Sequence, residues 1–178
     1  MYLMATRPDI RHAESVISRY MECPTDIHLL AAKIIFRYLQ GTKEFGLFYK
    51  NGEKSYLFGF IDSDYTGDLD DRKSTSRYVF MIGTGVVSWS LKKQPIVTLS
   101  SSEAEFVAAT ACACQAIWLK KILKELHFKE DGPTQIYSDN SSIIKLSKNP
   151  VLHGRSKHID VKYHFLRDLT NGVINLIY

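Results

Sequence analysis

Short runs of aromatic and β-branched residues, separated by turn residues, fill the stretch from residue 45 to residue 89. Such runs are typical of strands, and short turns between them are typical of hairpins. Asn51 and Gly52 form a strong hairpin signal, and the Gly-Thr-Gly sequence at residues 83–85 supplies a second turn. We therefore predict an antiparallel meander made of residues 45–49, 56–61, 78–82 and 86–89.

Two helices are expected before the first of these runs. Apolar residues recur at helical spacing in residues 8–22, and again in a segment that Thr25 can cap and Gly41 can end. The change from helical spacing to strand-like runs indicates a domain boundary near residue 45. We therefore expect a helical segment, residues 1–44, ahead of a separate domain, residues 45–178.

The second half of the chain alternates helices and strands. A long helix is expected after the serine run at residues 100–102, because serine is favoured at helix starts and leucines recur at helical spacing further on. The patterns that follow predict a strand at 135–137, a helix starting at 142–146, a helix at 161–169 and a last apolar stretch at 173–178.

Three acidic residues are placed oddly for a solvated surface. Asp62 ends one apolar strand, Asp139 ends another, and Glu105 lies near the start of the long helix. If the three carboxylates converge at one sheet edge, they repel one another and need cations, and hard oxygen ligands select magnesium or manganese. Two such ions can activate water and stabilise the leaving oxygen of a phosphodiester. Metal-assisted hydrolysis is the enzyme class that these residues favour.

These carboxylates also have purely structural interpretations. Glu105 stands three residues after Ser102, which is the spacing of a helix capping box, and this interpretation stays open. Asp62 and Asp64 resemble the first half of a calcium-binding EF-hand loop. Lys73 stands where that loop needs its bidentate glutamate, so the EF-hand is disfavoured.

Composition sets only mild limits on partners. The formal net charge of +4 is compatible with a polyanionic partner without indicating one. Basic pairs such as Lys92 and Lys93 would neutralise phosphates if several of them share a face. The charged residues at 68–73 are expected to form a solvated loop. No apolar run approaches the roughly 20 residues of a membrane span, and no signal-peptide pattern opens the chain. We expect no membrane partner and an intracellular setting.

Several longer motifs resemble one family, the Pol polyproteins of copia-type (Ty1/copia) long-terminal-repeat retrotransposons. TRPDI at 6–10 and RYLQGT at 37–42 resemble the C-terminal end of the reverse transcriptase and the connection that follows it. The motifs that resemble the ribonuclease H domain are GDLDDRKSTS at 67–76, VSWSLKKQ at 87–94, LSSSEAEF at 99–106, SDN at 138–140 and KHIDVKYHF at 157–165. They agree in order and spacing over nearly the whole chain.

The resemblance implies an α/β fold with a ribonuclease H-like mixed sheet, an antiparallel meander plus parallel strands, flanked by helices. A domain of this kind hydrolyses the RNA strand of an RNA/DNA hybrid. By motif, the catalytic residues that would hold two Mg²⁺ (or Mn²⁺) ions are Asp62, Glu105 and Asp139. Glu103 is the fallback for Glu105, because both glutamates stand near the helix start.

The implied partners are an RNA/DNA hybrid and the reverse transcriptase portion of the polyprotein. Ser101, Ser102 and Asn140 are expected to contact the sugar edge of the hybrid. Lys92 and Lys93 are expected to contact its phosphates. The resemblance implies that the protein works in a cytoplasmic virus-like particle or in the nucleus.

The chain also departs from the family pattern. The family domain continues into a helix that carries a fourth acidic ligand, whereas this chain stops at Tyr178, so we expect a domain truncated at its last strand. Asp160 precedes that strand and is not expected to be a substitute. Arg77 stands where glycine is usual and would be strained if its backbone needed a positive φ. The truncation motivates an alternative, a catalytically inactive remnant that at most binds nucleic acid.

Overall fold

The computed structural model describes residues 2–50, 56–128, 132–148 and 160–178 of the chain. The chain divides into two compact units, Met1–Asn51 and Gly52–Tyr178, which we call the N-terminal unit and the C-terminal unit. The assignment of the first helices to the end of a reverse transcriptase stays a prediction.

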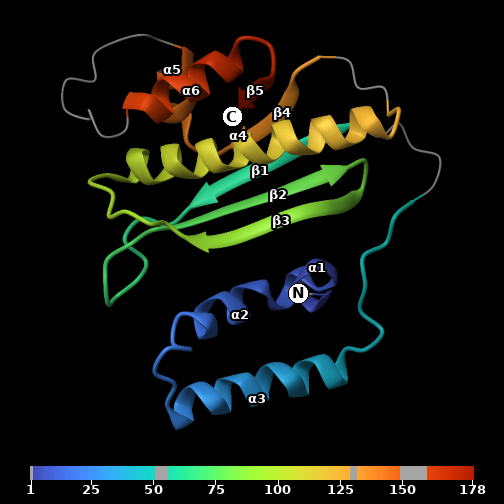
Figure 1. Cartoon of the computed structure of the whole chain (residues 1–178), viewed down its shortest axis with the longest axis vertical. Helices are drawn as coiled ribbons and strands as arrows, with labels where there is room; N and C mark the ends of the chain where they lie inside the picture. The colour runs from blue at the N-terminus through green and yellow to red at the C-terminus, as the bar shows by residue number, and fades with distance from the viewer. Residues whose placement is uncertain (1, 51–55, 129–131, 149–159) are drawn as a thin grey trace. The chain divides into compact units, whose positions relative to one another are not determined.

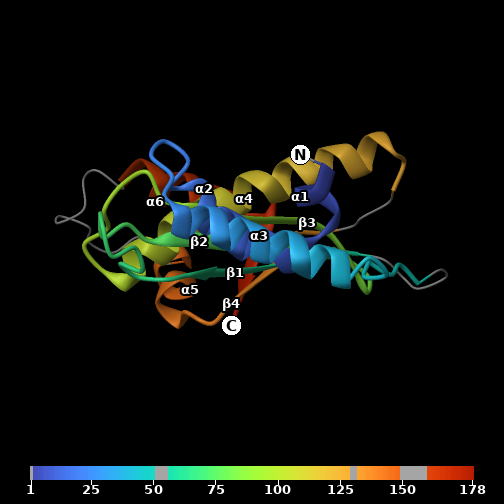
Figure 2. The ribbon, with the colours of Figure 1, turned by 90° about the horizontal axis from the view of Figure 1, so that it is seen from below.

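The N-terminal unit is helical. It contains α1 (Tyr2–Thr6), the 3-10 turn η1 (Pro8–Ile10), α2 (Arg11–Ser18) and α3 (Asp26–Gly41). Figures 1 and 2 show α2 running alongside α3. The backbone N–H of Thr25 donates to His28 Nδ1 at 3.0 Å, which caps α3 where the sequence predicted its start. The two helices expected in this segment are confirmed, and α1 is an addition.

The C-terminal unit is built on one mixed sheet. Its strands are β1 (Leu57–Ser63), β2 (Thr75–Ile82), β3 (Gly85–Lys93), β4 (Thr134–Ser138) and β5 (Ile174–Ile177), in the order β3-β2-β1-β4-β5. The first three strands form an antiparallel meander, β4 is parallel to β1, and β5 is parallel to β4. Gly83 takes a φ of +58° in the tight turn between β2 and β3, a conformation that favours glycine. The predicted mixed sheet is confirmed.

The strand expected at residues 45–49 is absent from the described structure. These residues follow α3 without regular structure, and the expected turn at Asn51 and Gly52 lies outside the described residues. β1 has β2 on one edge and β4 on the other. A strand has only two hydrogen-bonding edges, so β1 has no place for the predicted hairpin partner.

Helices cover the sheet and close the core of the C-terminal unit. α4 (Ser101–Glu125) contacts β1 and β2, and it packs with α5 (Ser141–Lys148) and α6 (Asp160–Thr170), as Figure 1 shows. Ile61 and Phe80 from the strands meet Phe106 of α4 and Leu166 of α6 in one hydrophobic cluster. Burying a side chain of this size contributes about 1.5 to 3 kcal/mol. The core therefore fixes α4 against the strand that carries Asp62.

The last motif of the sequence is described only in part. Residues 149–159, which include the first part of KHIDVKYHF, lie outside the described residues. α6 begins at Asp160, and β5 follows it. Asp160 therefore belongs to a helix that precedes the last strand, as the sequence indicated.

By length and composition alone, α4 is also apolar enough to cross a membrane. Its apolar side chains, among them Phe106, Ala113 and Leu123, are however part of the hydrophobic core. The core helix of a globular unit satisfies the same criteria, so α4 gives no reason to add a membrane to the expected partners.

Candidate metal centre

The parallel pairing of β1 with β4 brings two aspartates to one edge of the sheet. Asp62 lies near the end of β1, and Asp139 directly follows β4. The register pairs Ile61 with Ser138, so the two aspartates are the next residues on neighbouring strands. Both strands run in the same direction, and their carboxyl ends therefore meet at the same edge.

Glu105 joins these aspartates from near the start of α4. Carboxylate oxygens of Asp62, Glu105 and Asp139 all lie within 4.8 Å of one another. Asp62 and Asp139 are exposed, whereas Glu105 is buried. The structure thus brings together the three residues that the sequence singled out, with one buried member and two exposed members. We call this group the carboxylate triad.

The way α4 begins distinguishes Glu105 from Glu103. Ser100 is the N-cap, and its hydroxyl accepts the backbone N–H of Glu103 at 3.2 Å. The Glu103 carboxylate accepts the backbone N–H of Leu99 at 2.7 Å. The capping pair is therefore Ser100 with Glu103, and the capping box considered for Ser102 and Glu105 is wrong by two residues. Glu105 has no part in capping and points its carboxylate to the triad.

The environment of Glu105 is electrostatically unfavourable for a carboxylate. Glu105 is only 7% exposed. Its Oε1 accepts the backbone N–H of Ser63 at 3.3 Å, whereas its Oε2 is buried without a hydrogen-bond partner. Burial raises the pKa of Glu105 to about 7, and the charges of Asp62 and Asp139 add to the rise, while the bond from Ser63 opposes it. A nearby cation would relieve both effects.

The donor set fits a divalent metal ion. Three carboxylates from three different elements offer the hard oxygen ligands that Mg²⁺ and Mn²⁺ prefer. The unpaired Oε2 of Glu105 is a buried polar atom that needs a partner, and Glu105 is a member of this group. Asp62, Glu105 and Asp139 are the residues that would hold the ion.

Gln94 connects the elements that carry the triad, a role that its place in the sequence did not predict. Its buried side-chain Nε2 donates to the carbonyl of Ala104 at 2.8 Å and to the hydroxyl of Ser76 in β2 at 2.9 Å, and it shares a hydrogen with the hydroxyl of Ser63 at 3.3 Å. Ala104 precedes Glu105, and Ser63 follows Asp62. One amide therefore fixes the spacing between two of the carboxylates. Its only sequence signal was its place at the end of the VSWSLKKQ motif.

Arg77 lies directly opposite Asp62 in the antiparallel pair of β1 and β2. Its Nη1 is 3.0 Å from Asp62 Oδ2, and its Nη2 is 3.5 Å from Asp64 Oδ2. Arg77 is a strand residue and is not among the non-glycine residues with positive φ, so the strain considered at this position does not occur. The arginine places a positive charge beside one member of the triad.

The loop between β1 and β2 is more ordered than the sequence indicated. Asp68 is only 7% exposed, and it shares the Lys93 ammonium with Asp71 at distances of 2.7 and 2.9 Å. The hydrogen bond from Lys93 holds the pKa of Asp68 well below its ordinary value. The solvated-loop prediction is therefore wrong for Asp68, because a lysine from β3 supplies a partner that local spacing cannot reveal. Asp64 accepts the backbone N–H of Thr75, so this loop is closed by its own hydrogen bonds.

The residues expected to contact nucleic acid lie on several elements. Ser101 and Ser102 form the first residues of α4, and Lys92 is exposed on β3. Asn140 follows Asp139 directly, and its Oδ1 accepts a backbone N–H of α5 at 2.9 Å, which leaves its amide hydrogens to donate. The Lys93 ammonium is already bound by two aspartates. These nucleic-acid contacts stay predictions. The two ion pairs of Lys93 leave its ammonium less available to a phosphate than that of Lys92.

Comparison with known proteins places the chain among transposon polyproteins. No protein-family model matches it. It is 46% identical over 174 residues to the retrovirus-related Pol polyprotein from transposon TNT 1-94 of Nicotiana tabacum, which covers 96% of the chain and 13% of that protein. It is 40% identical over 178 residues to the Pol polyprotein from transposon RE1 of Arabidopsis thaliana, which covers 99% of the chain and 12% of that protein. Among solved structures, ribonuclease H1 from Halobacterium salinarum matches with a TM-score of 0.45 and 12% identity, over 67% of this chain and 80% of that one.

The C-terminal unit has a ribonuclease H-like fold, since its antiparallel meander is extended by parallel strands and flanked by helices. The chain belongs to the family of retrovirus-related Pol polyproteins of transposons. It spans only about an eighth of the length of these relatives, and therefore corresponds to one part of such a polyprotein.

The raised pKa of Glu105 predicts a pH-dependent stability in the absence of divalent metal. The folded protein holds this proton more tightly than the unfolded chain does, so the stabilisation is complete below pH 4.5 and is lost as the pH rises through about 7. We expect the free energy of unfolding to fall by up to about 3 kcal/mol between about pH 5 and pH 8 from this group. Urea denaturation in the presence of EDTA measures it.

Glu105→Gln separates this effect from other titrating groups. The variant should lack this part of the pH dependence and should be more stable than the wild type at pH 8. Glu125→Gln is the matched control, because Glu125 is exposed at the end of the same helix. Equal pH profiles for the wild type and Glu105→Gln would contradict the prediction.

Proposed function

We propose that the C-terminal unit hydrolyses the RNA strand of RNA/DNA hybrids with two divalent metal ions, as the ribonuclease H part of a copia-type retrotransposon polyprotein. The observation that carries this proposal is the carboxylate triad, with Asp62, Glu105 and Asp139 within 4.8 Å at one sheet edge. Bound Mg²⁺ or Mn²⁺ would supply activation of water and stabilisation of the leaving oxygen. Membership in the polyprotein family supports the choice of substrate.

The protein's own contribution is the placement of ligands on rigid elements. Asp62 and Asp139 are held by hydrogen-bonded strands, and Glu105 is held by a capped helix whose first turn Gln94 ties to the sheet. Rigid placement matters because a site that is loose by about 1 Å loses much of its activity. With a pKa of about 7, Glu105 has to release a proton when a cation binds near neutral pH.

Loss of a triad carboxylate is expected to abolish most hybrid cleavage. Asp62→Asn or Asp139→Asn should lower the cleavage rate at saturating Mg²⁺ by roughly 100-fold or more, because a neutral amide replaces a charged ligand of the cation. The measurement is cleavage of an end-labelled RNA strand within an RNA/DNA hybrid, with Mg²⁺ or Mn²⁺ present.

Asp70→Asn is the matched control for this assay, because Asp70 is exposed in the loop before β2 and lies outside the triad. It should cleave like the wild type. Single-stranded RNA and duplex DNA should remain intact. If the folded wild-type chain fails to cleave the hybrid, the proposed activity is wrong and the inactive-remnant alternative is favoured.

Substrate contacts are proposed for residues on two sides of the triad. Ser101 and Ser102 present hydroxyls at the start of α4, and Asn140 lies next to Asp139. Hydroxyl and amide groups at these positions suit the 2′-hydroxyls that distinguish RNA from DNA. Lys92 is exposed and suits a phosphate. Lys93 is already bound in two ion pairs, and we propose that it stabilises the fold instead.

Lys92 and Lys93 are therefore expected to differ when each is replaced by glutamine. Lys92→Gln should weaken hybrid binding and lower the slope of log affinity against log salt concentration by about one. Lys93→Gln should leave that slope unchanged and reduce the free energy of unfolding by about 1 to 3 kcal/mol, because Asp68 loses its cationic partner. Fluorescence anisotropy in EDTA and urea denaturation measure the two effects. The reverse pattern would contradict the assignment.

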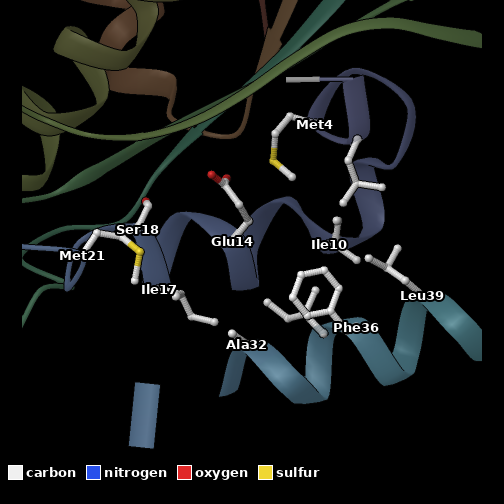
Figure 3. Close-up of a pocket in the computed structure, with 11 residues that line it drawn as sticks. Met4, Ile10, Glu14, Ile17, Ser18, Met21, Ala32, Phe36 and Leu39 are labelled. Atoms are coloured by element: carbon white, nitrogen blue, oxygen red, sulfur yellow. The ribbon is translucent and has the colours of Figure 1, made fainter. Parts of the chain in front are cut away.

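The N-terminal unit offers a surface for the reverse transcriptase portion of the polyprotein, which we propose as its partner. α3 contains no buried residue, although Ile27, Leu30 and Ile34 are apolar and more than half exposed. A neighbouring apolar pocket of about 320 Å³ has Ile10 and Phe36 in its lining (Figure 3). Exposed apolar patches of this kind mark interaction sites, and the relatives extend far beyond the length of this chain.

A charge placed on this surface should weaken the association. Ile34→Glu is expected to raise the dissociation constant for the separately expressed polymerase portion by about tenfold or more, since it buries a charge in an apolar contact. Calorimetry or surface plasmon resonance measures it. Leu126→Glu, an equally drastic change at an exposed leucine of the C-terminal unit, is the control and should bind like the wild type. Equal affinity of both variants would refute the partner assignment.

A further inference from the structure

We propose that Arg77 is a built-in competitor for one of the cation positions beside Asp62. The inference rests on the proposed metal-dependent function and concerns how many ions the triad takes up, and how tightly. Arg77 is the basic residue whose ion pair reaches a triad carboxylate within the described part of the chain. Its guanidinium therefore fills space that a second divalent ion would need. It also neutralises part of the carboxylate charge that would attract this ion.

Two neighbouring carboxylates hold the guanidinium in this place. Nη1 is 3.0 Å from Asp62 Oδ2, and Nη2 is 3.5 Å from Asp64 Oδ2. Asp64 is itself fixed, because its other oxygen accepts the backbone N–H of Thr75. The strand register adds to this, since Asp62 and Arg77 are direct cross-strand partners. The arginine is thus directed at Asp62 by both backbone and side-chain contacts.

The pairing uses one of the two oxygens of Asp62. A carboxylate can offer one oxygen to each of two cations, and an ion that takes Oδ2 of Asp62 has to displace Arg77. The guanidinium would also repel any cation that binds beside it. The first ion can bind at the remaining triad oxygens, whereas the second ion competes with the arginine.

The same geometry shows that Arg77 can be displaced. The side chains of Arg77 and Asp62 are 41% and 51% exposed, and exposed pairs of this type are weak. Arg77 Nε is buried without a hydrogen-bond partner, so the present position of the side chain leaves one donor unsatisfied. Movement of the guanidinium into solvent would satisfy that donor. Arg77 therefore weakens the second cation position without closing it.

The test is a titration of the full chain with Mn²⁺, followed by calorimetry and by the electron paramagnetic resonance signal of free Mn²⁺. We compare the wild type with Arg77→Met, which keeps the apolar stem, and with Arg77→Lys, which keeps the charge. Lys121→Met is the matched control, because it removes one exposed positive charge that lies about 24 Å from Glu105 along the axis of α4. Circular dichroism verifies that each variant is folded.

The wild type is expected to bind one Mn²⁺ ion more tightly than the second. Arg77→Met should bind the second ion about fivefold tighter or more, while Arg77→Lys and Lys121→Met remain close to the wild type. Unchanged affinity in Arg77→Met, or equal tightening in Lys121→Met, would overturn the role of Arg77 and leave the metal site intact. Absence of Mn²⁺ binding in every folded variant would instead overturn the proposed metal-dependent function.

Discussion

The parallel pairing of β1 with β4 is the constraint on which the candidate site depends. It sets Asp62 and Asp139 on neighbouring strand ends, and the start of α4 adds Glu105 to the same edge. Like charges at this separation oppose folding, so the rest of the unit has to hold them together. Burial raises the pKa of Glu105, and the charges of Asp62 and Asp139 raise it further.

The surrounding structure meets this cost with a few well-defined contacts. The hydrophobic cluster that includes Phe80 and Phe106 presses α4 onto the sheet. Ser100 caps the helix together with Glu103, which leaves Glu105 to the triad. Gln94 then links the first turn of α4 to the end of β1 by hydrogen bonds of its side chain. Packing thus brings the elements together, and polar contacts set their spacing.

Basic side chains divide into different roles around this edge. Lys93 is bound within the fold by Asp68 and Asp71, and Arg77 is paired with Asp62 at the triad itself. Lys92 is exposed and unconstrained by such a pair among the described contacts. Net charge therefore says little about nucleic-acid binding here, because part of the positive charge is neutralised inside the protein.

The sequence by itself determined the local elements and the residues of the triad. Strand-like runs and the serine cap predicted the meander and α4, and aspartates at strand ends marked Asp62 and Asp139, because these signals are local in the chain. Local sequence patterns failed for residues 45–49, which were predicted to form a strand. They have strand-like composition, but β1 has no free edge for them. Only the tertiary structure decided the links made by Gln94 and the pairing of Arg77 with Asp62. Those features depend on which residues from distant parts of the chain meet in space, and no periodicity along the sequence records that.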